Sequence, residues 1–197
     1  MNKEKSIEFL NTLFGINGFQ KRPNFELPDA FKDLLRISNE LSITVPQKFA
    51  NIYARFNLQE LLARKADISQ EVTCYWAYSS KKSGIPNYLF EGFLNADEII
   101  SARKEYSDFE ELLFEGGLLK IGRTPWVGGI YLGVGKQNNE HIYWVKLDVL
   151  AEDISPEQIG KVDFEGINLI ANDINGFIEG LHAYFPEESG EDTLPYL

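Results

Sequence analysis

The stretch of residues 118–149 constrains the fold of this chain more than any other. It reads LLKIGRTPWVGGIYLGVGKQNNEHIYWVKLDV. Apolar residues dominate three runs, at residues 118–122, 129–134 and 141–149, and Gly, Pro or the polar loop at 137–140 separates them. Short runs rich in β-branched and aromatic residues, bounded by turn residues, are typical of strands. The stretch therefore predicts three strands, the last two of which form a hairpin.

Helical periodicity surrounds this stretch. One helix is expected to open at Pro28 with Asp29, a second at Pro46, a third at Asn95 as its cap, and a short helical piece over residues 108–114. A final helix is expected around residues 167–181. The apolar stripes of the first, second and last helices are Phe31, Leu34, Leu35, Ser38 and Leu41; Phe49, Ile52, Tyr53 and Phe56; and Ile167, Ile170, Ala171, Ile174, Phe177, Ile178 and Leu181.

Two further strands are expected at residues 72–78 and 87–94, joined by a turn that contains Gly84 and Pro86. With 197 residues, the chain is long enough to bury one full core, and no linker or repeat divides it. The elements together predict a single α+β domain, with a mainly antiparallel sheet of about five to six strands flanked by helices. Residues 1–29 then form a helical N-terminal extension, and residues 186–197 an acidic tail.

Charge is distributed unevenly along the chain. Residues 151–197 carry eleven Asp or Glu against a single lysine, Lys161, whereas residues 1–150 are close to neutral. A nucleic-acid partner is not expected, because binding to phosphates requires the opposite sign. An acidic surface suits a basic protein partner, although it can equally serve solubility alone. No apolar run reaches membrane-spanning length or forms a signal-peptide core. The lone Cys74 forms no disulfide within the chain, which favours a cytoplasmic location.

Catalytic and cofactor motifs are hard to assemble from these residues. The GVGK of residues 133–136 lacks the first glycine and the final Ser or Thr of a phosphate-binding loop, so a turn explains it better. With His141, His182 and Cys74 as the only His and Cys residues, no metal or nucleophile set is evident. Adjacent carboxylates such as Glu110 and Glu111 point apart on a helix. We therefore expect no enzyme activity, no cofactor and no metal.

Several short motifs follow one another along residues 30–182. They are Val45-Pro46 after a helix, Asn95-Ala96-Asp97-Glu98-Ile99-Ile100 after a strand, Leu119-Lys120-Ile121-Gly122, Val127-Gly128-Gly129-Ile130-Tyr131-Leu132, His141-Ile142-Tyr143-Trp144, and Ile170-Ala171-Asn172-Asp173-Ile174-Asn175-Gly176-Phe177-Ile178. In this order they resemble the SUKH superfamily, which includes fungal Smi/Knr cell-wall regulators and bacterial immunity proteins. The chain departs from the family pattern at Leu58, where Gly is usual, and at Ile130, where Asp usually follows the glycine pair.

This resemblance implies a non-enzymatic protein-binding domain. It implies most directly an immunity protein that binds and neutralises a cognate bacterial toxin with a basic surface, such as a nuclease. A regulatory or scaffolding protein of the same fold, related to cell-wall synthesis or signalling, is the alternative, and a small enzyme or ligand-binding protein is a third. The residues expected to bind the partner are Trp126, Gly128, Gly129, Tyr131, Trp144, Glu152 and Asp153. Strand aromatics usually pack inward, so at least two of the three aromatic residues are alternatively expected in the core.

Overall fold

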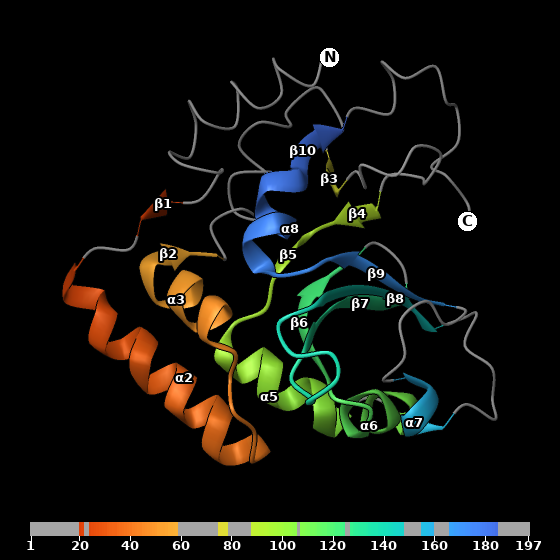
Figure 1. Cartoon of the computed structure of the whole chain (residues 1–197). Coiled ribbons are helices and arrows are strands. Elements are labelled where there is room, and N and C mark those ends of the chain that lie inside the picture. The colour runs from red at the N-terminus through yellow and green to blue at the C-terminus, as the bar shows by residue number, and fades with distance from the viewer. Residues whose placement is uncertain are drawn as a thin grey trace.

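A five-stranded antiparallel sheet forms the centre of the fold, in the order β5-β6-β7-β8-β9 (Figure 1). Its strands are β5 (Gly92–Phe93), β6 (Leu118–Arg123), β7 (Gly128–Gly133), β8 (Ile142–Lys146) and β9 (Ile167–Ala171). The structure is a computed structural model and describes residues 20–21, 24–58, 75–78, 88–105, 107–124, 127–147, 155–159 and 166–184. The three strands predicted within residues 118–149 are β6, β7 and β8, so that prediction is confirmed.

Two smaller antiparallel sheets accompany the central one. β3 (Tyr75–Tyr78) lies between β4 (Tyr88–Phe90) and β10 (Leu181–Tyr184), and β1 (Gln20–Lys21) pairs with β2 (Phe56–Asn57). The single strand expected over residues 87–94 is therefore divided. Its first part, β4, joins the three-stranded sheet, and its second part, β5, forms the edge of the central sheet. Glu91 lies at the division, and its N–H donates to the carbonyl of Arg123 at 2.9 Å.

Helices pack around the central sheet, and the α+β class is thereby confirmed (Figure 1). The described helices are the 3-10 turn η2 (Asn24–Glu26), α2 (Leu27–Leu41), α3 (Gln47–Arg55), α5 (Ala96–Glu105), α6 (Ser107–Glu115), α7 (Pro156–Ile159) and α8 (Ile174–Gly180). In the part of the chain that the structure describes, none of them has the length and apolar character that crossing a membrane requires.

The two faces of the central sheet bury two separate apolar clusters. The first core joins the sheet to α2, α3, α5 and α8, and the second joins it to α6 and α7. Alternation along β7 shows the division, since Ile130 and Leu132 belong to the first core and Tyr131 to the second. Successive strand residues point to opposite faces. Because both faces of the sheet are covered, β7 does not alternate apolar and exposed polar residues as a half-exposed strand does.

The expected final helix over residues 167–181 is wrong in part. The segment folds as strand β9, helix α8 and strand β10. Strand β9 ends at Ala171, and Asp173 then caps the helix, because its backbone is extended and its Oδ1 accepts a hydrogen bond from the Gly176 N–H at 2.9 Å. The apolar residues repeat at helical spacing by coincidence, since β9 pairs with β8 and is covered on both faces. Periodicity alone does not separate a doubly covered strand from a buried helix.

The first predicted stripe also differs from the structure. Helix α2 buries Ala30, Leu34, Ile37 and Leu41, whereas Phe31 and Leu35 are 54% and 63% exposed. The helix begins near Pro28 as expected, but its buried face is rotated by about one residue. The helical extension predicted for residues 1–29 lies mostly outside the described residues, as does the whole acidic tail.

Candidate functional site

The glycine pair at the predicted partner-binding site begins strand β7. Gly128 and Gly129 are described, while Trp126, Glu152 and Asp153 lie outside the described residues. Tyr131 is fully buried and Trp144 is 8% exposed. The alternative expectation, that at least two of the three aromatic residues lie in the core, is confirmed. On the surface beside the pair stands Val127, 66% exposed, which the sequence did not single out.

Both glycines are required by close packing. Gly128 has φ +145°, and a side chain there would overlap the carbonyl oxygen of Val145 on β8. A Cβ on Gly129 would lie 2.8 Å from Lys120 Cε, so its absence lets the lysine chain cross β7. The following residue, Ile130, is fully buried in the first core. An Asp at that position would be buried without water, which explains physically why the chain carries an apolar residue there.

The lysine that crosses Gly129 reaches a buried polar cluster. Lys120 Nζ lies 2.7 Å from Glu110 Oε1, and the Tyr131 hydroxyl donates at 2.9 Å to the same carboxylate. Burial, and then the Glu110 carboxylate, raise the pKa of Tyr131 well above 10.0. The tyrosine stays protonated and holds helix α6 against β7. Glu110 points inward and its neighbour Glu111 outward, as expected for adjacent helical residues.

The outer face of helix α6 is acidic. Asp108, Glu111 and Glu115 are exposed at positions i, i+3 and i+7, and the helix contains no lysine or arginine. Residues at this spacing share one face of a helix. Helix α7 packs beside α6 and adds the exposed Glu157. We call these four residues the acidic face. It lies on the second-core side of the molecule, where α6 and α7 cover the sheet (Figure 1).

A groove of about 440 Å³ lies at the C-terminal end of α6. It is lined by Glu115, Gly116, Gly117, Gly135, Lys136, Gln137, Asn138, Pro156 and Glu157. The buried Asn138 side chain connects the hairpin loop to the end of α6. Its Oδ1 accepts a hydrogen bond from the Gly135 N–H at 2.9 Å, and its Nδ2 donates to the Gly116 carbonyl at 3.2 Å. The glycines of residues 133–136 thus serve the packing of a hairpin loop, in agreement with the turn that the sequence favoured.

The histidines and the cysteine occupy ordinary structural positions where they are described. His141 Nδ1 lies 3.4 Å from the Tyr143 hydroxyl, on β8 and the turn before it. The backbone of His182 lies in β10, and Cys74 is outside the described residues. Within the described ranges, no group of three or more His, Cys, Asp or Glu side chains is arranged to hold a metal ion.

Comparison with known proteins gives no relative: no family model matches the chain, and neither the curated proteins nor the solved structures contain a match. The candidate site therefore depends on its own geometry. That geometry consists of the acidic face, the adjoining groove, and a second pocket beside Gly128.

Proposed function

We propose that this protein is a non-enzymatic binding domain that acts as an immunity protein and neutralises a cognate toxin with a basic surface. The acidic face is the observation that carries the proposal. Its four carboxylates, Asp108, Glu111, Glu115 and Glu157, are exposed on adjacent helices. Neither helix supplies a cation, because Ser107–Glu115 and Pro156–Ile159 contain no lysine or arginine.

Electrostatics support this choice of partner. The C-terminal quarter of the chain has the same sign as the acidic face, with eleven acidic residues against Lys161. A surface of one sign steers an oppositely charged protein and raises the association rate by about 10- to 1000-fold at low salt. A nuclease toxin is basic where it meets phosphate, so an acidic inhibitor can cover that surface. The α+β fold and the order of the SUKH-like motifs fit the same role, which we place in the cytoplasm.

The proposal is tested with the product of the neighbouring reading frame. We expect that gene product to be toxic, and co-expression with this protein to restore growth. The double substitution Glu111→Lys/Glu115→Lys should lower the association rate at least tenfold in low salt and weaken the rescue. The control Asp29→Lys/Glu179→Lys makes the same charge change at exposed positions of α2 and α8, and should retain rescue.

The outcomes separate the alternatives. A toxic neighbour that wild-type protein neither binds nor neutralises overturns the immunity role. An equal loss in both charge-reversal variants removes the acidic face as the binding surface. If the protein instead co-purifies with envelope-synthesis or signalling proteins through this face, it belongs to the regulatory alternative.

A further inference from the structure

A second pocket lies between helix α5 and strand β6. Its volume is about 250 Å³, and it is lined by Glu91, Leu94, Glu98, Ser101, Ala102, Lys120, Arg123, Thr124 and Gly128. It combines two cations, two carboxylates, two hydroxyl groups and two apolar side chains. Typical small-molecule sites measure roughly 300–1000 Å³, so this one suits a ligand of only a few heavy atoms.

An irregularity in β6 brings the two cations together. Lys120 and Arg123 are three residues apart, and in a regular strand their side chains would point to opposite faces. The pairing with β7 shifts between Lys120, opposite Tyr131, and Gly122, opposite Ile130. This bulge places one extra residue on the first-core face, so Arg123 returns to the face of Lys120. Bulges often re-aim side chains in this way next to functional sites.

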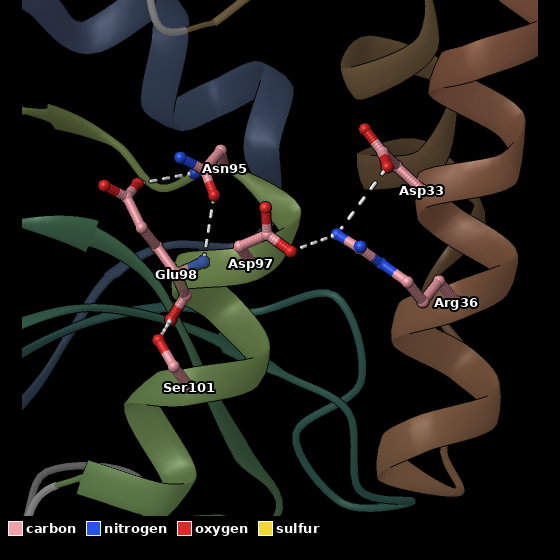
Figure 2. Close-up of polar contacts among 6 residues, drawn as sticks. All are labelled: Asp33, Arg36, Asn95, Asp97, Glu98 and Ser101. Atoms are coloured by element: carbon pink, nitrogen blue, oxygen red, sulfur yellow. Dashed lines mark hydrogen bonds and ion pairs between the residues drawn. The ribbon is translucent and has the colours of Figure 1, made fainter.

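Each cation is held in place by a carboxylate. Lys120 is fixed by the buried Glu110, and Arg123 Nη2 pairs with Glu98 Oε1. Glu98 is itself fixed, because its Oε2 accepts from the Asn95 N–H at 2.8 Å while its own N–H donates to Asn95 Oδ1 at 2.9 Å. Figure 2 shows this reciprocal cap, and shows the neighbouring Asp97 turned the other way, toward Arg36 of α2. The pocket walls are therefore ordered before any ligand binds.

Two groups in the pocket retain binding capacity. Within the described residues, the Glu91 carboxylate makes no hydrogen bond or ion pair. Arg123 has five N–H donors, and its side-chain partner among those residues is Glu98 alone. The same small pocket therefore contains Glu91, which can bind a cation, and Arg123, which can bind an anion. Lys120 adds a second positive charge beside Arg123.

From this arrangement we propose that the pocket binds a small zwitterion, a free α-amino acid with a short apolar side chain. Its carboxylate pairs with Arg123 beside Lys120, and its ammonium pairs with Glu91. Leu94 and Ala102 supply the apolar wall against which the side chain packs. A purely anionic ligand would meet Glu91 and Glu98, and a purely cationic one would meet Lys120 and Arg123. The inference is independent of toxin binding, because none of the four residues of the acidic face lines this pocket.

The test titrates ¹⁵N-labelled full-length protein with L-alanine and, separately, with propionate and ethylamine, which each carry one of its two charges. We expect alanine to shift the amide signals of Glu91, Ser101, Thr124 and Gly128. Propionate and ethylamine should bind at least tenfold more weakly. Glu91→Gln and Arg123→Gln should each weaken alanine binding at least tenfold, because each removes one of the two ion pairs.

The controls Glu111→Gln and Arg55→Gln lie outside the pocket and should bind alanine as the wild type does. If Arg123→Gln gives a collapsed spectrum, Arg123→Lys keeps the charge without the planar fork and should still weaken binding. An absence of shifts up to 50 mM alanine overturns the proposal. So does propionate or ethylamine binding as tightly as alanine, or a Glu91→Gln variant that binds alanine unchanged.

Discussion

The Tyr131 hydroxyl lies 2.9 Å from each carboxylate oxygen of Glu110, and so joins helix α6 to the middle of the central sheet. Lys120 completes the contact from β6, and its side chain crosses the space that Gly129 leaves open. One buried carboxylate therefore connects α6, β6 and β7. The acidic face and the α5–β6 pocket both lie on elements that this contact positions.

Replacement of the buried carboxylate should destabilise the fold. Glu110→Gln removes the carboxylate that pairs with the Lys120 ammonium, and the lysine side chain is only 16% exposed. Loss of one member of a buried pair costs about 3–5 kcal/mol, and somewhat less here because the lysine keeps some contact with water. Urea unfolding measures the difference. The adjacent Glu111→Gln, on the exposed side of the same helix, should change the free energy of unfolding by less than about 0.5 kcal/mol. Equal effects would contradict the structural role of Glu110.

The protonation of Tyr131 predicts a decline of stability in alkali. Its pKa is raised above 10.0 in the folded protein, so the unfolded chain loses this proton first as the pH rises. The tyrosine's contribution is complete below about pH 10 and is lost as the pH rises through the folded pKa. We expect Tyr131→Phe to be less stable than wild type at pH 8. The difference in the free energy of unfolding between the two proteins should narrow between pH 10 and 11. A gap that stays constant over this interval would exclude the linkage.

Substitution by alanine should change the stability of the protein in opposite directions at two glycines. A Cβ on Gly129 would lie 2.8 Å from both Lys120 Cε and the Gly122 carbonyl, so Gly129→Ala should cost about 1–3 kcal/mol through overpacking. Gly176 lies in helix α8, and its nearest Cβ contacts would be 3.7 and 4.0 Å. Gly176→Ala should therefore stabilise the protein by about 0.5–1 kcal/mol. Thermal unfolding distinguishes the two, and stabilisation by both would show that β7 has room beside Lys120.

Asp173 combines a helix cap with an ion pair, and two substitutions separate them. Asn keeps the cap and Ala removes it, so Asp173→Ala should be about 1 kcal/mol less stable than Asp173→Asn at pH 7. The Lys48 ammonium at 2.7 Å, and then the Gly176 N–H, lower the pKa of Asp173 below 3.8. The stabilisation that the ionised Asp173 gains from these two contacts is present above about pH 4, and it is lost as the pH falls through the pKa of Asp173 in the folded protein. The difference in the free energy of unfolding between wild type and Asp173→Asn should therefore disappear in acid. A difference that grew in acid would contradict the ion pair between Asp173 and Lys48.

Local patterns correctly predicted the elements that one periodicity dominates. The hairpin of residues 118–149, the helix that Asn95 caps and the opposite directions of Glu110 and Glu111 all follow from spacing and capping. The pattern failed where several elements follow one another within one series of apolar residues. Residues 167–181 contain strand β9, helix α8 and the first residue of β10, and their apolar side chains are buried against other parts of the molecule. The predicted apolar stripe of α2 was wrong for a related reason. The elements that pack against a helix determine which face it buries, and here they leave Phe31 and Leu35 exposed.

By itself the sequence determined the α+β class, the three strands β6, β7 and β8 of the central sheet and the acidic charge of the final quarter. These depend on periodicity, turn residues and composition, which act over short distances along the chain. Only the tertiary structure decided that Glu110 turns inward to Tyr131 and Lys120, that Gly129 makes room for that lysine, and that a bulge sets Arg123 beside it. Those relationships join residues from separate elements, and packing in three dimensions creates them.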